Sequence, residues 1–209
     1  MRTAMEGFLV HAWPRTRAGR TVLYLVGRLS DGRTFAAVEE RFRPWFCVRR
    51  SESQEARRLA GEAEWGEAGL RTMDGEPCLQ ARFPTAEARQ QAREALAAAG
   101  LRTYEADLRV ADQFRMQARV HGSLRIRGPH RAGRHVDLVF RDPELEASQW
   151  PPALSVLSLD IETDLKEATV LAVGLAHRDP FRESREEVLY AGARLEPGKV
   201  SDPAIRVFA

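Results

Sequence analysis

The alternation of apolar and polar residues predicts that the first fifty residues are mainly β structure. Gly7–Trp13 is a short apolar-rich run that Pro14 is expected to end. Arg20–Leu29 is rich in apolar and β-branched residues, and a similar run resumes at Arg33–Val38. Asp31-Gly32 lies between these two runs, a pairing that predicts a β-hairpin.

The next sixty residues have the pattern of a small α+β unit, and their order of elements predicts a ferredoxin-like arrangement. The expected elements are a strand at Pro44–Val48, a helix over Ser51–Trp65 capped by Ser51 or Ser53, a hairpin around Asp74-Gly75, a helix over Thr85–Ala99 and a strand at Leu101–Glu105. Thr85 is the expected N-cap of the Ala-rich helix, and Gly100 closes it.

A domain boundary is expected near residue 148. A helix over Ala111–Val120 and a strand at Val136–Phe140 precede it, and Asp142–Pro152, with three prolines, is interpreted as a linker. The sequence therefore predicts an N-terminal domain over residues 1–148 and a second domain over residues 149–209.

Beyond the linker, nearly continuous apolar runs predict buried strands. The runs are Ala153–Ile161, Val170–Ala176 and Glu187–Tyr190. Strands that are covered on both faces have this pattern. The short segments between the runs favour antiparallel neighbours.

Composition excludes several classes of protein. Of the residues, 44% are hydrophobic and 30% are charged, which is typical of a globular chain. No run of about 18 apolar residues indicates a membrane span, and the N-terminus lacks the apolar region of a secretory signal. Cys47 and Cys78 have the spacing of neither a zinc site nor a disulfide framework, so buried thiols and a cytoplasmic location are expected.

Positive charge is concentrated between Arg109 and Arg141. This stretch holds eight arginines against Asp112 and Asp137, a local excess of six positive charges. A solvated charged face and a surface that meets a phosphate backbone both explain such a pattern.

The candidate chemistry lies in Leu159-Asp160-Ile161-Glu162-Thr163, at the end of an apolar run. Strand alternation puts Asp160 and Glu162 on one face, with Ile161 turned towards the core. Two carboxylates on one face favour a cation between them, and Mg²⁺ or Mn²⁺ prefers such oxygen ligands. Two such ions about 4 Å apart can cleave a phosphodiester. The alternative is a strand end whose acids simply meet solvent; the flanking apolar strands favour the metal site.

These residues carry a resemblance to a known family. SVLSLDIET followed by VLAVGLA resembles the first exonuclease motif of family B DNA polymerases. GFLVHAW, TYEADLRVADQFRMQARV and QWPPALSVLSLDIET resemble, in that order, stretches of the bacterial DNA polymerase II type. The resemblance implies an α+β N-terminal domain, with β-hairpins and a ferredoxin-like unit, followed by the first strands of an RNase H-like 3′–5′ exonuclease.

The resemblance also implies roles for particular residues. Asp160 and Glu162 would be catalytic ligands of two Mg²⁺ or Mn²⁺ ions in a complete exonuclease site. The resemblance places Thr163 beside the terminal nucleotide. The charge of the arginine-rich stretch separately predicts nucleic-acid contacts from four arginines: Arg115, Arg119, Arg125 and Arg127. Tyr104 and Asp107 match family positions too, but a structural interpretation is preferred, with Tyr104 in core packing and Asp107 as a helix cap.

The chain departs from the family in length, because a full member continues through further exonuclease motifs and a polymerase. An N-terminal fragment of a DNA-directed DNA polymerase, inactive alone, is therefore expected. The expected partners are template DNA and the primer 3′ end, with deoxynucleotides and a sliding clamp for the parent enzyme, which would be cytoplasmic and nucleoid-associated. No membrane partner is expected.

Two other functions stay open. A stand-alone RNase H-like nuclease would draw its other acids from Asp164 to Asp202. A non-enzymatic nucleic-acid-binding module would use residues 1–148 and the arginines of 109–141.

Overall fold

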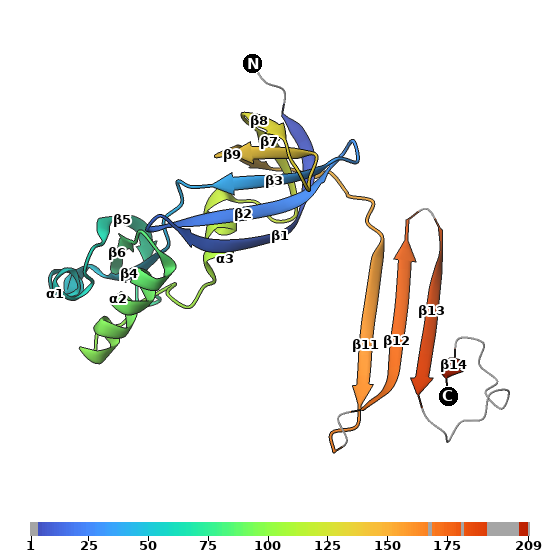
Figure 1. Cartoon of the computed structure of the whole chain (residues 1–209). Coiled ribbons are helices and arrows are strands. Elements are labelled where there is room, and N and C mark those ends of the chain that lie inside the picture. The colour runs from blue at the N-terminus through green and yellow to red at the C-terminus, as the bar shows by residue number, and fades with distance from the viewer. Residues whose placement is uncertain (1–3, 167–168, 181, 192–204, 209) are drawn as a thin grey trace. The chain divides into compact units, whose positions relative to one another are not determined.

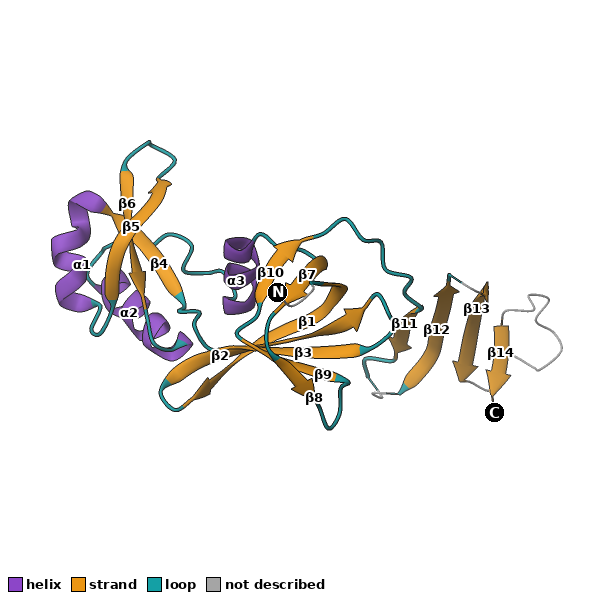
Figure 2. Cartoon of the chain, turned by 90° about the horizontal axis from the view of Figure 1, so that it is seen from above, coloured by secondary structure: helices purple, strands orange, loops and turns teal. Residues whose placement is uncertain are grey.

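The computed structural model describes residues 4–166, 169–180, 182–191 and 205–208, and the chain divides into two compact units, Met1–Pro152 and Ala153–Ala209 (Figures 1 and 2). The strands of the first unit are Met5–Arg17 (β1), Arg20–Leu29 (β2), Thr34–Glu39 (β3), Trp45–Arg49 (β4), Glu64–Arg71 (β5), Pro77–Arg82 (β6), Ser123–Arg127 (β7), His130–Ala132 (β8), Leu138–Arg141 (β9) and Glu144–Ala147 (β10). Its helices are Ser53–Leu59 (α1), Ala86–Ala98 (α2) and Val110–Ala118 (α3), with a 3₁₀ turn at Arg50–Glu52 (η1). The strands of the second unit are Val156–Thr163 (β11), Val170–Asp179 (β12), Arg182–Ala191 (β13) and Ile205–Phe208 (β14).

A seven-stranded sheet in the order β10-β7-β1-β2-β3-β9-β8 forms most of the first unit. The expected hairpin at Asp31-Gly32 is confirmed, because β2 and β3 pair antiparallel on either side of it. Alternate residues of β2, including Leu23 and Leu25, are buried on one face of the sheet. Helix α3 packs on that side, where Phe114 meets Phe42 edge to face with ring centroids 5.6 Å apart.

Contrary to the prediction from the sequence, the first strand does not end at Pro14. β1 continues to Arg17, and Pro14 pairs with Leu23 of β2. On its other side β1 is paired with β7 only over Met5–Phe8. Pro14 therefore lies where the strand has a partner on one side only, a position in which a residue without an N–H costs no ladder bond.

A three-stranded sheet in the order β4-β6-β5, with α1 and α2, forms the smaller part of the first unit. The hairpin at Asp74-Gly75 is confirmed by the antiparallel pairing of β5 and β6. Thr85 caps α2 as predicted, since its Oγ1 accepts a hydrogen bond from the Ala88 N–H at 3.0 Å. The element order is the strand–helix–strand–strand–helix order of a ferredoxin-like unit. The final strand, however, is reduced to an isolated bridge between Cys47 and Tyr104, so a full strand at Leu101–Glu105 was a wrong prediction.

Helix α1 is much shorter than the predicted helix over Ser51–Trp65. It ends at Leu59, Gly61 follows with φ +66°, and Trp65 already belongs to β5. The predicted cap is wrong as well, because the N-cap is Glu52 and makes no side-chain capping bond. Propensity favoured a longer helix, but pairing with β6 takes the residues after Gly61 into the sheet.

Two predictions around residues 107–152 are also corrected. Arg109, not Asp107, is the N-cap of α3, and Asp107 is exposed. The segment interpreted as a linker contains β10, which pairs antiparallel with β7 through matches such as Leu145 with Ile126. Its acidic residues lie opposite arginines of β7, which explains why a polar, proline-flanked segment forms a strand.

The second unit is a four-stranded sheet in the order β11-β12-β13-β14 (Figure 1). The predicted antiparallel neighbours are confirmed for β11–β12 and β12–β13, whereas β14 runs parallel to β13. The predicted burial of β11 is wrong: all its residues are exposed, including Leu159 at 58% and Ile161 at 50%. The described part of the second unit contains no helix of its own, and apolar residues on both faces of β11 are exposed.

Among the described residues, none of the helices has the length and apolar character needed to span a bilayer.

Candidate functional site

Asp160 and Glu162, the β11 acids, lie on the same face of their strand. They are two residues apart in a regular part of the ladder, where Asp160 pairs with Gly174 and Glu162 with Ala172 of β12. Ile161 between them points to the other face, but it is exposed and not in a core as expected. The predicted juxtaposition of the two carboxylates is therefore present, on an accessible sheet face.

The neighbours of the β11 acids are small and uncharged on β12. Gly174 has no side chain, and Ala172 contributes only a methyl group. Asp160 Oδ1 accepts a hydrogen bond from the N–H of Ile161 at 3.1 Å. Within the described ranges, neither carboxylate forms an ion pair, so the negative charge of the pair is not balanced by a side chain of the sheet.

A second pair of acids with the same spacing shows what a structural pair looks like in this chain. Glu144 and Glu146 of β10 pair directly across the sheet with Arg127 and Arg125 of β7. The guanidinium-to-carboxylate distances are 3.9 Å in both cases. Cross-strand arginines neutralise this pair, whereas glycine and alanine face the β11 acids. The two pairs thus differ in the charge opposite them, not in their spacing.

The β11 acids fit part of a divalent metal site. Carboxylate oxygens are the ligands that Mg²⁺ and Mn²⁺ prefer, and the small residues on β12 leave room for metal-bound water. No group of three or more Asp, Glu, His or Cys side chains that could hold a metal is found among the described residues. The two carboxylates would therefore supply two ligands, and water or groups outside the described residues would have to complete the coordination.

The other acids after Thr163 do not complete the site in the described part of the unit. Asp164 follows β11 and accepts a hydrogen bond from the Lys166 N–H at 2.7 Å. Glu167, Glu196 and Asp202 lie outside the described residues. Thr163, a predicted nucleic-acid contact, is exposed at a register shift between β11 and β12.

Of the four predicted nucleic-acid-binding arginines, Arg115 and Arg119 lie on and just after α3. Arg115 reaches Asp112 at 3.5 Å and donates a hydrogen bond to the His121 carbonyl at 3.2 Å. Arg119 is the C-cap in a left-handed conformation, with φ +55°, and is exposed. For Arg119 the described residues provide no ion-pair partner, so its guanidinium is available to solvent.

Arg125 and Arg127 lie on β7 and are engaged by carboxylates from outside the arginine-rich stretch. Arg125 also contacts Glu6 of β1, at 3.3 Å. The structure thus brings Glu6, which lies more than a hundred residues earlier in the sequence, to this stretch. Exposed pairs of this kind contribute little stability, so their arginines could still exchange a carboxylate for a phosphate.

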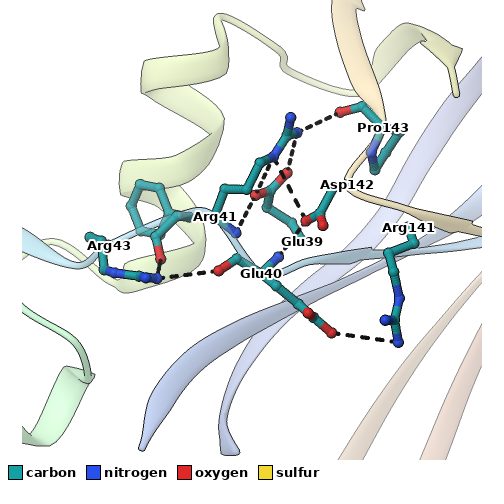
Figure 3. Close-up of polar contacts among 8 residues, drawn as sticks. Glu39, Glu40, Arg41, Arg43, Arg141, Asp142 and Pro143 are labelled. Atoms are coloured by element: carbon teal, nitrogen blue, oxygen red, sulfur yellow. Dashed lines mark hydrogen bonds and ion pairs between the residues drawn. The ribbon is translucent and has the colours of Figure 1, made fainter.

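The end of the arginine-rich stretch is tied to the end of β3 in the same way (Figure 3). Arg141 lies 3.7 Å from Glu40. The Glu40 N–H donates to Asp142 Oδ1 at 2.7 Å, which joins β3 to the residue after β9. Arg41 donates to the buried carboxylate of Glu39 at 2.8 Å, and this hydrogen bond raises the pKa of Arg41. These polar contacts hold the ends of β3 and β9 together, and they pair Arg141 with a carboxylate. They therefore argue against a continuous positive face over residues 109–141.

A cluster of aromatic side chains that was not predicted from the sequence lies on the outer face of the large sheet. This cluster, the aromatic stack, consists of His11, Trp13 and Tyr24, whose rings are near-parallel. The ring centroids are 5.4 Å apart for His11–Trp13 and 5.6 Å apart for Trp13–Tyr24. The Arg17 guanidinium lies 5.5 Å from the Tyr24 ring centroid. The aromatic residues are visible in the sequence, but their meeting on one face is not.

A β-bulge brings the aromatic stack to the outer face. The register of β1 against β2 shifts between Leu9, which is buried in the core, and His11. Val10 lies at the shift and is 64% exposed. Simple alternation from Leu9 would have pointed Trp13 into the core; the extra residue reverses the facing, so that Trp13 pairs with Tyr24 instead.

Tyr104 has a structural role, as expected, but it is half-buried at the edge of the small sheet and does not pack in the core as predicted. Its N–H and carbonyl pair with Cys47 of β4, and its hydroxyl accepts a hydrogen bond from Arg49 Nε at 3.0 Å. Tyr104 thus closes the small sheet at its β4 edge.

A solved structure has a similar fold. The family B DNA polymerase from the hyperthermophilic archaeon Pyrobaculum calidifontis matches 91% of this chain with a TM-score of 0.62 and 23% sequence identity. The chain folds like the N-terminal region of that polymerase. It spans 27% of the polymerase's length. The expected mixed α+β, sheet-rich architecture is confirmed by this likeness. Neither a protein-family profile nor a curated protein sequence matches the chain.

Proposed function

We propose that this chain is the N-terminal part of a family B DNA polymerase of the bacterial DNA polymerase II type. The likeness of fold to a family B polymerase over 91% of the chain supports the assignment. The resemblance of Tyr104-Glu105-Ala106-Asp107 and of the segment leading to Asp160 supports the finer type. The partners of the parent enzyme would be template DNA, the primer 3′ end, deoxynucleotides and a sliding clamp.

The second unit would begin the 3′–5′ proofreading exonuclease of that enzyme. The observation that carries this proposal is the placement of the β11 acids on one face, opposite glycine and alanine and without a cationic partner in the described residues. Asp160 and Glu162 would hold Mg²⁺ or Mn²⁺, which when bound activates water and stabilises the leaving oxygen of a phosphodiester. Thr163 would lie beside the terminal nucleotide.

The chain by itself is proposed to be inactive as a nuclease. Two carboxylates on an open sheet face cannot fix the positions of two metal ions, because each ion needs several protein ligands to be held in one geometry. Weak binding of a single divalent ion is therefore the expected property of the 209-residue chain.

The test is Mn²⁺ titration of the ¹⁵N-labelled chain, read by paramagnetic broadening of amide signals. Broadening is expected first around Asp160, Glu162 and Gly174, and it should be lost in the double variant D160N/E162Q. The matched control is E144Q/E146Q, which removes the acids of identical spacing that face arginines. Broadening in β11 that survives D160N/E162Q would overturn the metal proposal.

An activity assay separates the fragment from a stand-alone nuclease. A 3′-labelled oligonucleotide incubated with the chain and Mg²⁺ should stay intact. Degradation that requires Mg²⁺ and is abolished by D160N would instead support an independent RNase H-like enzyme.

A further inference from the structure

A hollow of about 780 Å³ in the first unit is lined by β1 and by the first turn of α3. This volume lies within the range of small-ligand sites, roughly 300–1,000 Å³. With His11 counted as neutral, the charged residues of its wall are three arginines and one aspartate: Arg89, Arg109, Arg115 and Asp112. Three positive charges against one negative charge leave an excess of two positive charges around the hollow.

One of these arginines, Arg89 of α2, is a buried cation without a counter-ion. It is 8% exposed, and its Nη1 donates hydrogen bonds to the Leu108 carbonyl at 3.1 Å and to Gln113 Oε1 at 2.8 Å, both neutral acceptors. Its Nε is buried and has no hydrogen-bond partner, and within the described ranges no carboxylate forms an ion pair with it. Burial lowers the pKa of the guanidinium. A buried charge that lacks a counter-ion is costly, so an anion in the hollow would be stabilising.

The first turn of α3 presents free N–H groups to the same hollow. The N-cap residue, Arg109, makes no side-chain capping bond. Val110 and Ala111 line the hollow, and their N–H groups have no acceptor among the described residues. The N-terminus of a helix favours an anion, because its N–H groups are unpaired and the helix dipole is positive there.

Asp112 does not supply the missing negative charge. Its carboxylate pairs with Arg109 at 2.7 Å and with Arg115 at 3.5 Å. One carboxylate shared by two arginines offsets one charge, and the Nε of Arg115 is also buried without a partner. The wall therefore stays cationic after all its ion pairs in the described residues are counted.

We propose that this hollow binds a small dianionic oxyanion, either inorganic phosphate or a dicarboxylate. Arg89 and Arg115 would balance its charge, and the N–H groups of Val110 and Ala111 would donate hydrogen bonds to its oxygens. The site uses none of the β11 acids, so the inference goes beyond the proposed function and does not rest on it.

The burial of Arg89 favours a small ligand over a nucleic-acid strand. At 8% exposure, its guanidinium can be reached only by a group that enters the hollow. A phosphodiester within a strand carries one negative charge and has a sugar on either side. A free phosphate or a dicarboxylate carries close to two charges near neutral pH, which matches the excess charge of the wall, and has no bulky flanks.

The test is isothermal titration of the full chain with inorganic phosphate and, separately, with malonate, in chloride buffer of constant ionic strength. At least one of the two anions should bind saturably with one site per chain, and the tighter of them identifies the class of ligand. R89Q should raise the dissociation constant by about 10- to 150-fold, the effect of losing a hydrogen bond to a charged group. Binding of neither anion would overturn the proposal.

A second variant removes a donor and leaves every charge in place. V110P deletes one N–H at the first position of α3, where proline fits because Arg109 before it is extended, with φ −59° to −63° not exceeded and ψ 141°. It should raise the dissociation constant by about 2- to 10-fold. Circular dichroism checks that each variant is folded, and V110P decides the matter if R89Q does not fold.

The matched control is R119Q, which removes one positive charge from the other end of α3. Arg119 is the C-cap and does not line the hollow, so R119Q should bind the anion as the unmodified chain does. Equal losses in R119Q and R89Q would mean that only the net charge matters, and would contradict a defined site. Displacement of the bound anion by an equal concentration of an oligothymidine without a terminal phosphate would also contradict it.

The outcome is independent of the exonuclease assignment. D160N/E162Q should bind the anion as the unmodified chain does. Loss of Mn²⁺ binding with intact anion binding therefore concerns the β11 acids alone, and the reverse result concerns the hollow alone.

Discussion

Asp160 pairs across the sheet with Gly174, so no side chain of β12 stands directly beside its carboxylate. A Cβ at Gly174 would lie 3.8 Å from Asp160 Cβ, an ordinary contact distance. The strand pairing itself therefore does not demand glycine at this position. The absence of a side chain at residue 174 instead leaves room for a metal ion to approach the β11 acids.

Enlarging residue 174 should reduce metal binding without unfolding the sheet. G174L places a branched side chain beside Asp160 and should weaken Mn²⁺ binding by on the order of tenfold, as changes next to metal ligands commonly do. G174A should bind like the unmodified chain, because its methyl group meets only normal contacts. Isothermal titration or amide broadening measures both variants, and equal affinities for leucine and glycine would contradict the interpretation.

Gly27 should be essential for the packing of the large sheet. A Cβ there would lie 2.1 Å from the Phe8 carbonyl oxygen and 2.6 Å from the Phe35 ring. G27A should therefore lower the free energy of unfolding by about 1–3 kcal/mol or more, because both neighbours must shift. G66A is the control: nothing lies within 4 Å of its added Cβ, and a change below about 0.5 kcal/mol is expected in urea unfolding.

Asp137 should make part of the stability depend on acid pH. Its Oδ2 accepts hydrogen bonds from the Thr34 hydroxyl and N–H, both at 2.7 Å, and these bonds lower the pKa of Asp137 in the folded state. The stabilisation is therefore present above the unfolded-state pKa, roughly 3.9, and is lost as pH falls through the lower folded-state pKa. D137N should be less stable than the unmodified chain at neutral pH, and the difference should shrink towards pH 2.

The measurement is the urea midpoint of both proteins across this pH range. T34V removes the hydroxyl donor but keeps the N–H donor, so it should show an intermediate pH dependence. A constant difference between D137N and the unmodified chain at all pH values would argue against the linkage.

The two cysteines should be unreactive while the chain is folded. Cys47 is 1% exposed, and burial raises the pKa of its thiol to about 12. Burial also raises the pKa of Cys78. Since the thiolate is the reactive form, a disulfide reagent at about pH 8 should modify neither cysteine in native buffer and both in urea. Rapid native labelling of Cys47 would show that the small sheet opens locally.

Local features of the fold were predictable from short stretches of sequence. Thr85 caps the N–H of Ala88, within four residues of itself. The Ala-rich pattern that predicts α2 lies within the helix. The Asp-Gly hairpins likewise need only their own turn and the flanking apolar runs. The β11 acids belong to this class too, because alternation along one strand suffices to place Asp160 and Glu162 on the same face.

Predictions failed where a distant partner decided the conformation. The residues after Gly61 join β5 because β6 pairs with them, against their helix propensity. The acidic segment after Asp142 forms β10 because Arg125 and Arg127 of β7 lie opposite it. No pattern within either segment contains that information.

One strand, β1, shows the division between local and tertiary information. Its apolar composition was enough to predict extended backbone, since strand propensity and alternation act between neighbouring residues. The facing of Trp13 depended on a bulge at Val10, and its stacking partner Tyr24 comes from the returning strand. Side chains that meet across strands do so only after the sheet has set its register, and register is a property of two segments together.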